Sequence, residues 1–176
     1  MAILVTGAAG FIGSHLLERL VDAGRPAVGL DNFNDYYDPR IKRANAAALA
    51  RKGARIVEGD ICDERLCDEL MSRERIDLIV HLAARAGVRP SLEQPRLYER
   101  VNCGGTANLL ELARKHGHPK FVFASSSSVY GNNAKVPFSE DDPVDQPISP
   151  YAATKRACEL MAYAYHHLYG IKVVCL

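Results

Sequence analysis

The sequence contains no tryptophan, carries almost no net charge and has no apolar run long enough to cross a membrane. A formal net charge of +1 gives no global attraction to nucleic acid or to an acidic membrane surface, so we expect neither as a partner. The first residues already read as an apolar strand, which leaves no room for a signal peptide. We therefore expect a cytoplasmic protein.

The cysteines and histidines lack the spacings that are typical of a disulfide framework or a metal site. The five cysteines are odd in number and include no Cys-x-x-Cys pair, which predicts reduced, mostly buried thiols. The six histidines show no His-Glu-x-x-His pattern, so we predict no metal site. A length of 176 residues fits one domain with a sizeable core, and we find no internal repeat.

Positive charge gathers in one stretch, between residues 40 and 55. The stretch contains no acidic residue, and its cations are Arg40, Lys42, Arg43, Arg51, Lys52 and Arg55. We interpret it as the solvated face of a helix whose last cations lie near the helix C-terminus.

The stretch from Ile3 to Gly13, ILVTGAAGFIG, joins an apolar run to an amphipathic one through a glycine-rich turn. A strand, such a turn and a helix in this order direct backbone N–H groups and the positive helix end at one point, which suits a pyrophosphate. Gly7 allows the tight turn, Gly10 lets the backbone approach the phosphates, and Gly13 lets helix and strand pack closely. Asp31 ends the next apolar run, where a carboxylate can bind a ribose 2′-OH and disfavour the 2′-phosphate of NADP. The pattern predicts binding of NAD.

Strand-like and helix-like segments alternate along the chain. Strands are expected near 2–6, 26–31, 54–58, 76–82, 120–125 and 171–176, and helices near 13–23, 39–52, 63–73, 94–116 and 150–169. This alternation predicts an α/β fold, a doubly wound parallel sheet with helices on both faces. With the glycine turn in the first unit, we expect a Rossmann domain over residues 1–176 with strand order 3-2-1-4-5-6.

The residues suited to chemistry follow the fifth expected strand. Ser125–Ser128 emerges where that strand ends, the edge of an open α/β sheet at which ligands bind. Farther on, Ser149-Pro150 reads as the start of a helix, which places Tyr151 in the first turn and Lys155 on the same helix face. A phenol has an ordinary pKa near 10, so a tyrosine base needs positive charge beside it. A lysine, a helix N-terminus and an oxidised nicotinamide together would supply that charge.

Taken together, these motifs resemble the extended short-chain dehydrogenase/reductases, in particular their nucleotide-sugar epimerases and dehydratases. The resemblance covers the whole chain and rests on TGAAGFIG (6–13), Asp31, Gly59-Asp60-Ile61, HLAA (81–84), Asn102 with Gly105-Thr106, SSSSVYG (125–131) and YAATK (151–155). It implies that Tyr151 is the catalytic base, that Lys155 favours the phenolate and holds the nicotinamide ribose, and that Ser126 hydrogen-bonds the reacting sugar hydroxyl. Asn102 would complete the tetrad by fixing a water or the lysine, although a polar residue there could equally satisfy local backbone.

The resemblance also implies a set of binding residues. For NAD these are Gly7, Gly10, Phe11, Ile12, Gly13, Asp31, Asn32, Asp60, Ile61, Leu82, Ala83, Ala84, Tyr151 and Lys155, with Asp60 and Ile61 facing the adenine. For a UDP-sugar substrate they are Arg89, Ser127 and Ser128.

The two serines after Ser126 help to place the chain within the family. Dehydratases carry an Asp-Glu pair at these positions, and Ser127 and Ser128 cannot serve as the carboxyl acid and base that elimination needs. That favours simple epimerisation. The segment from Asp31 to Arg43 and the run Ala86–Arg89 resemble most the UDP-glucuronate 4-epimerases, whereas Arg85 and Pro90 depart from their pattern. A dehydratase or reductase of the same family, or a non-catalytic NAD-binding module, remains an alternative.

Two further expectations come from the same resemblance. Family chains continue past the sixth strand into a smaller C-terminal lobe that grips the nucleotide-sugar, so we expect this chain to be the N-terminal, cofactor-binding part of a longer epimerase and to lack that lobe. The apolar faces of the expected helices 94–116 and 150–169 predict a homodimer, with packing on the chain's own sheet as the alternative.

Overall fold

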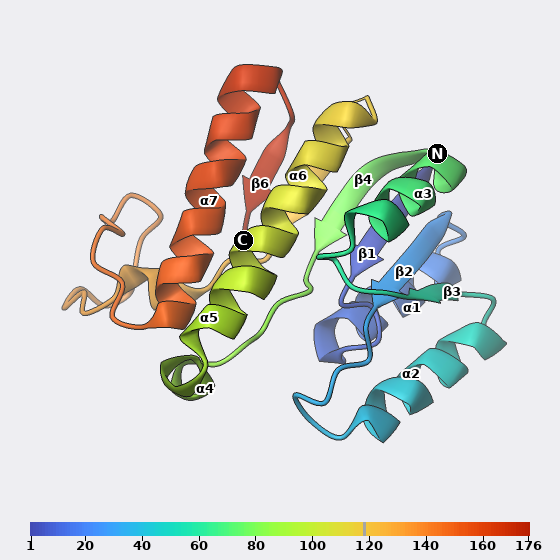
Figure 1. Ribbon diagram of the computed structural model, residues 1–176, viewed down its shortest axis with the longest axis horizontal. Helices are drawn as coiled ribbons and strands as arrows, with labels where there is room; N and C mark the ends of the chain where they lie inside the picture. Colours follow the sequence, from blue (N-terminus) through green and yellow to red (C-terminus); the bar gives the residue numbers. More distant parts are fainter. Residues whose placement is uncertain (118) are drawn as a thin grey trace.

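A computed structural model of the chain, described here for residues 1–117 and 119–176, contains a single six-stranded parallel sheet (Figure 1). The strands are β1 (Ala2–Thr6), β2 (Ala27–Asp31), β3 (Arg55–Glu58), β4 (Ile76–His81), β5 (Lys120–Phe123) and β6 (Val173–Cys175). Their order across the sheet is β3-β2-β1-β4-β5-β6, which confirms the predicted Rossmann topology. The order reverses between β1 and β4, so the crevice for a ligand lies at the carboxyl ends of these two strands.

Helices connect the strands. They are α1 (Phe11–Asp22), α2 (Pro39–Arg51), α3 (Glu64–Glu74), α4 (Val88–Glu93), α5 (Pro95–Tyr98), the π-helix η1 (Glu99–Gly104), α6 (Gly105–Lys115), the 3-10 helix η2 (Ser127–Tyr130) and α7 (Pro150–Tyr169). The predicted strands and most predicted helices are present within a few residues. The first helix begins at Phe11, two residues before the expected start, because Gly10 already serves as its N-cap.

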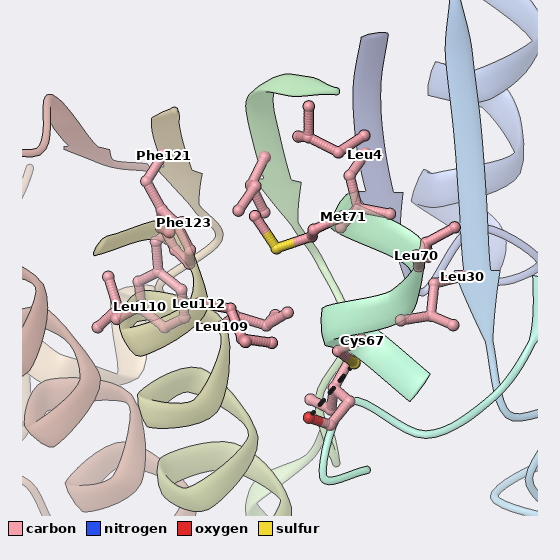
Figure 2. Close-up of a cluster of buried hydrophobic side chains, with 14 of the residues drawn as sticks. Leu4, Leu30, Cys67, Leu70, Met71, Leu109, Leu110, Leu112, Phe121 and Phe123 are labelled. Carbon is pink, nitrogen blue, oxygen red and sulfur yellow. Dashed lines mark hydrogen bonds between the residues drawn. The ribbon is translucent and has the colours of Figure 1, made fainter. Parts of the chain in front are cut away.

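Apolar side chains pack on both faces of the sheet. One core cluster joins alternate strand residues such as Leu4 and Leu30 to side chains of α3, α6 and α7, and Figure 2 shows Met71 and Leu109 approaching the sheet within it. The second cluster joins the intervening residues Ile3 and Val5 to α1 and α2. Strand β1 is buried along its whole length, as its uninterrupted apolar sequence predicts.

Local sequence signals set the helix boundaries. Asp38, Asp63 and Ser149 each cap a helix by accepting a hydrogen bond from the amide two or three residues ahead, as their residue types predict. Gly170 follows α7 in a left-handed conformation (φ 71°), which a glycine adopts without strain.

The segment before α6 is divided more finely than the sequence predicts. A helix was expected near residues 94–116, and the segment is helical without a break from Pro95 to Lys115. The structure adds two details, namely a division into α5, the wider-wound η1 and α6, and the unpredicted α4 before them. A single π-helical turn displaces the helical periodicity by about one residue, which is too small a change for the sequence pattern to reveal. Its consequence is local: Asn102 lies in the π-helix and faces inward.

The cysteines also depart in part from expectation. All five are free thiols, but only Cys67 and Cys158 are buried, while Cys103 is half-buried and Cys62 and Cys175 are exposed. Among the residues that the structure describes, no helix is both long and apolar enough to traverse a lipid bilayer.

Candidate functional site

The glycine turn between β1 and α1 has the geometry of a phosphate-binding loop. Gly7 adopts φ 69°, and a Cβ there would lie 2.9 Å from the Ala83 nitrogen. A Cβ on Gly13 would lie 2.1 Å from the Gly7 carbonyl oxygen, so only glycine lets α1 pack this closely on the turn. Gly10 caps α1 without a side-chain hydrogen bond, which leaves the first helical amides directed at the crevice.

A pocket opens beside this turn over the carboxyl ends of β1, β2 and β4. Its walls contain predicted cofactor residues, namely Gly7, Gly10, Phe11, Asp31, Asn32, Ile61 and the segment Leu82–Ala84. Ile12 and Gly13 lie next to it in α1, with Ile12 64% exposed and Gly13 packed under the turn. Asn34, Tyr36, Tyr37, Lys42 and Val101 also line the pocket and were not predicted as cofactor residues. The place and lining of the pocket fit the adenosine half of a dinucleotide.

Asp31 is buried at the end of β2 and is held by backbone donors. The Ala9 amide donates to Oδ2 at 3.0 Å and the Phe33 amide donates to Oδ1 at 2.8 Å. Each carboxylate oxygen retains a further lone pair, so the group can still accept hydrogen bonds from a ribose. The position suits the predicted contact with the 2′-OH.

Lys42 contradicts the interpretation of the basic stretch as a solvated helix face. Its side chain is buried against the pocket, with Nζ 3.9 Å from Asp31 Oδ1 and donating to Asn34 Oδ1 at 3.0 Å. Burial lowers the pKa of Lys42, while the Asp31 charge opposes that shift. Arg40 and Arg43, on the same helix, are exposed as expected. The difference arises because Lys42 lies on the face of α2 that turns toward the loop 32–37, and residue type alone does not show which turn of a basic helix faces inward.

Ile61 lines the same pocket, and Asp60, which precedes it and lies outside the lining, is held in place by hydrogen bonds. The Asn32 side chain donates to Asp60 Oδ2 at 2.9 Å and the Cys62 amide donates to Oδ1 at 2.8 Å. Burial opposes ionisation of Asp60, but these hydrogen bonds outweigh it and lower its pKa. The buried Ile61 side chain packs on Gly105, where a Cβ would lie 2.4 Å from Ile61 Cδ1. This contact gives Gly105 a packing role behind Ile61.

A buried hydrogen-bond chain fixes the segment Leu82–Ala84. Thr6 Oγ1 accepts from the amides of Leu82 (3.2 Å) and Ala83 (3.1 Å) and lies 2.8 Å from His81 Nδ1. With both amides donating to it, the Thr6 hydroxyl donates its own proton to Nδ1, which leaves the imidazole proton on Nε2 to bond Thr106 Oγ1 at 2.9 Å. Burial, with Lys155 nearby, lowers the pKa of His81 to about 3, so the ring is neutral.

The catalytic candidates lie on η2 and α7, which pack against each other beyond the end of β5. Lys155 is buried on α7, and its Nζ donates to the Ala124 carbonyl at 2.7 Å, immediately before the serine run. Ser126 caps η2 through its Oγ, which accepts from the Ser128 amide at 3.1 Å. Tyr151 lies half-buried in the first turn of α7. Its ring packs edge-on against the Tyr98 ring, with 6.2 Å between the two ring centroids. The hydrogen bond from Lys155 thus ties the Tyr151 helix to the strand that presents Ser126.

Asn102 uses its side chain to hold backbone and a neighbouring hydroxyl. Its Oδ1 accepts from the Arg85 amide at 2.7 Å, and its Nδ2 donates to the Arg85 carbonyl at 3.1 Å and to Thr154 Oγ1 at 3.1 Å. The carboxamide therefore secures the segment after Ala84 to the first turns of α7.

The predicted substrate residues lie on two separate elements. Arg89 is exposed in the first turn of α4, whereas Ser127 is exposed and Ser128 half-buried in η2. Within residues 1–117 and 119–176 no hydrogen bond joins the two elements directly, and no cluster of three or more metal-ligating side chains occurs.

Comparison with known proteins identifies the family of this chain. The sequence profile of the family described as GDP-mannose 4,6 dehydratase matches residues 4–176. The chain belongs to this family. It is thus a member of the extended short-chain dehydrogenase/reductases, as its motifs predict.

Several proteins that are similar to this chain are named as UDP-sugar 4-epimerases. UDP-glucuronate 4-epimerase 4 of Arabidopsis thaliana is 51% identical over 177 residues, covering 100% of this chain and 40% of the plant protein. The structure of UDP-glucuronic acid 4-epimerase from Bacillus cereus, in complex with UDP-glucuronic acid and NAD, matches with a TM-score of 0.90 at 36% identity, covering 99% of this chain and 55% of that one. UDP-glucose 4-epimerase from Thermus thermophilus, in complex with NAD, matches with a TM-score of 0.86 at 37% identity, covering 99% of this chain and 54% of that one. The chain therefore spans about half the length of the solved relatives and less of the plant ones.

The burial of Lys155 leads to a prediction about how the stability of this dehydrogenase/reductase chain depends on pH. Burial lowers the pKa of Lys155 to about 8, against 10.5 for an exposed lysine. Between pH 8 and 10.5 the unfolded chain binds more protons at this site than the folded one, so stability rises with pH. Relative to the Lys155→Met variant, we expect the unmodified chain to gain about 3 kcal/mol of unfolding free energy across that window.

Urea unfolding at a series of pH values measures this difference. The exposed Lys172→Met variant serves as the matched control, for which the difference from the unmodified chain should stay constant with pH. Parallel stability curves for the unmodified chain and Lys155→Met would contradict a desolvated ammonium at position 155.

Proposed function

We propose that this chain is the cofactor-binding and catalytic part of an NAD-dependent UDP-sugar 4-epimerase whose substrates are UDP-glucuronate and UDP-galacturonate. The observation that carries the proposal is the hydrogen bond from Lys155 Nζ to the Ala124 carbonyl at 2.7 Å, which sets the Tyr151–Lys155 face of α7 against the serine run at the carboxyl edge of the sheet. The pocket beside the glycine turn, here called the adenosine pocket, opens at the same edge. The names of the epimerase relatives, and NAD in two of the solved structures, support the same assignment.

Bound NAD would accept a hydride from the sugar and later return it. Gly7, Gly10, Asp31 and the segment Leu82–Ala84 would hold its adenosine and pyrophosphate part. Lys155 would contact the nicotinamide ribose, since its ammonium lies at the crevice end of β5. The backbone amides of the glycine turn and the N-terminus of α1 would stabilise the phosphate charge.

In this proposal Tyr151, as phenolate, removes the proton from the sugar 4-OH while Ser126 holds that hydroxyl by a hydrogen bond. The 4-keto sugar turns over in the pocket, and Tyr151 returns the proton as hydride arrives on the opposite face. Catalysis is redox-neutral overall.

A uronate substrate places an extra demand on the site. The 4-keto intermediate of UDP-glucuronate is a β-keto acid that readily loses carbon dioxide. Ser127 and Ser128 follow the catalytic Ser126 directly, and we assign them the hydrogen bonds that hold the carboxylate in an orientation that disfavours this loss. Arg89, on the exposed side of α4, is assigned to the anionic part of the same substrate.

A dehydratase is the second candidate, because the matching family carries a dehydratase name. Elimination of water requires a carboxyl acid–base pair next to the catalytic hydroxyl. The chain has Ser127 and Ser128 at those positions, which favours epimerisation.

The homodimer is also part of the proposal. Helices α6 and α7 lie side by side (Figure 1). On the predicted faces, Leu109 and Leu112 pack into the chain's own core, whereas Leu160 and Leu168 on α7 are exposed. We therefore assign the dimer contact to the exposed face of α7 rather than to the whole of residues 94–116 and 150–169.

The proposed function is tested with a joined protein, in which residues 1–176 are followed by the part of the Bacillus cereus enzyme that lies beyond the matched region. We expect it to convert UDP-glucuronate to UDP-galacturonate without lasting NADH absorbance, as followed by chromatography and spectrophotometry. GDP-mannose and UDP-glucose are supplied in parallel. A 4-keto-6-deoxy product would instead identify a dehydratase, and net formation of NADH would identify an oxidoreductase.

A further inference from the structure

A largely buried carboxylate on α7 lies close to the catalytic candidates, and the proposed reaction assigns it no role. Glu159 follows Lys155 by four residues, so the two side chains lie on the same face of the helix. The Glu159 side chain is 17% exposed, against 44% for Glu111, a glutamate that pairs with an arginine three residues away on α6. A charge withdrawn this far from water is costly unless it is bonded, so the partners of Glu159 show what it does.

Glu159 ties α7 to the end of β5. The Ser125 hydroxyl donates to Glu159 Oε1. One residue earlier, the Ala124 carbonyl accepts from Lys155 Nζ at 2.7 Å. Two side chains one helical turn apart on α7 therefore hold two consecutive residues at the end of β5, and the next residue along the chain is Ser126.

Glu159 is also the negative charge that faces the Lys155 ammonium. Burial lowers the pKa of Lys155 to about 8, and two groups on α7, Cys158 and Glu159, oppose that shift. The Cys158 thiol donates to the Asn102 carbonyl at 3.3 Å, so it retains its proton and has no charge. Arg156 occupies only one carboxylate oxygen of Glu159, with Nη1 3.0 Å from Oε2. The carboxylate thus remains as the group that favours the charged form of the desolvated lysine.

The other titratable groups around this part of α7 do not supply a negative charge near neutral pH. His81 on β4 is buried, with the lysine nearby, which lowers its pKa to about 3 and leaves it neutral. Burial raises the pKa of Tyr98 on α5 and raises the pKa of Cys175 on β6 to about 11. A hydrogen bond with Cys158, together with burial, raises the pKa of Cys103 on η1. The charged side chains of α4, α5 and η1, which pack on α7, are exposed, namely Arg89, Glu93, Arg96, Glu99 and Arg100.

We propose that Glu159 is a positioning residue, which holds the end of β5 against α7 through Ser125 and supplies the negative charge that faces the Lys155 ammonium. It acts through these two residues and touches neither cofactor nor sugar. The proposal rests on the proposed function only where Lys155 is assigned to the nicotinamide ribose. Without the carboxylate, Lys155 loses its proton closer to neutral pH, and the serine run is less firmly held.

The titration of Lys155 in the 176-residue chain, without cofactor, tests the charge pairing by itself. NMR of protein labelled with ¹³C at lysine Cε follows the titration, and the signal that is absent from Lys155→Met identifies the residue. In Glu159→Gln we expect the midpoint to fall by about one pH unit from its value near 8, because an opposite charge is lost and Arg156 is left unpaired. Glu159→Asp keeps the charge and should restore most of the midpoint. Glu111→Gln removes the matched glutamate of α6 and should leave the midpoint unchanged.

The affinity for NAD⁺, measured by calorimetry at about pH 6 and pH 7.5, is the second readout. A midpoint lower by one unit reduces the charged fraction of Lys155 about threefold at pH 7.5, so Glu159→Gln should bind NAD⁺ about threefold more weakly there and like the unmodified chain at pH 6. A shifted midpoint with unaltered NAD⁺ affinity at both pH values would contradict the assignment of Lys155 to the ribose, which belongs to the proposed function, and would still support the pairing.

The link through Ser125 is tested by urea unfolding of the same chain. Ser125→Ala and Glu159→Ala should together destabilise the chain by less than the sum of their separate effects, because each removes the same hydrogen bond. A cooperative transition also verifies that each variant is folded. Additive effects would overturn the link, and an unchanged Lys155 midpoint in folded Glu159→Gln, or an equal shift in Glu111→Gln, would overturn the charge pairing.

Discussion

Replacing Tyr151 with phenylalanine is expected to slow epimerisation by about 10²–10⁴-fold, the usual contribution of a positioned general base. The substitution removes only the phenolic oxygen, and the ring keeps its edge-on contact with Tyr98 at 6.2 Å. NAD binding should change little, because the adenosine pocket lies on the other strands. The rate is measured in the joined protein as UDP-galacturonate formed, and the NAD affinity in the 176-residue chain.

Two further variants serve as a control and as a second test of the catalytic assignment. Tyr163→Phe makes the same change on the exposed side of the same helix, where Tyr163 is 69% exposed, and should leave the rate unaltered. Lys155→Met should reduce both rate and NAD affinity, because Lys155 is assigned to the base and to the nicotinamide ribose. Should Tyr151→Phe turn over near the parent rate, the base is another group and the assignment of the catalytic tetrad is wrong.

The second large effect concerns the 176-residue chain by itself. We expect it to bind NAD and yet to form UDP-galacturonate at a rate at least about 10³-fold below that of the Bacillus cereus enzyme. The described residues supply a cofactor pocket, Tyr151, Lys155 and Ser126, but few groups that would grip a nucleotide diphosphate. Binding energy from remote parts of a substrate positions the reacting carbon, so its loss lowers turnover as well as affinity.

The comparison uses equal concentrations of the two proteins with NAD⁺ and UDP-glucuronate, with product followed by chromatography. The last strand also presents apolar surface, since Val174 and Leu176 are exposed beside the serine run, so sedimentation at several concentrations should show self-association. Turnover by the chain alone close to that of the full-length relative would contradict the division of labour proposed here.

Much of the fold could be predicted because several independent signals agree. Apolar runs at regular spacing, glycine after the helices and the caps Asp38, Asp63 and Ser149 all indicate the same alternation of strands and helices. The glycine turn then fixes the strand order, because its place in the first unit is characteristic of the Rossmann topology. The carboxyl edge of the sheet, and with it the location of the site, follows from that order.

The details of the site that escaped prediction depend on tertiary contacts. Lys42 belongs to a run of cations, and only the position of α2 against the loop 32–37 shows that this one is buried beside Asp31. Asn102 can be recognised as a motif residue, but its partners Arg85 and Thr154 lie 17 and 52 positions away. Asn102 is buried in the π-helix η1, whose winding the apolar pattern of the sequence does not reveal.

The neutral histidine at the centre of the sheet has a consequence for kinetics. Histidines near an active site usually complicate the reading of pH–rate profiles, because they titrate in the range in which enzymes are assayed. His81 lies in the core with Lys155 nearby, and its pKa of about 3 removes it from that range. An inflection between about pH 5 and 8 in the pH–rate profile therefore does not arise from His81.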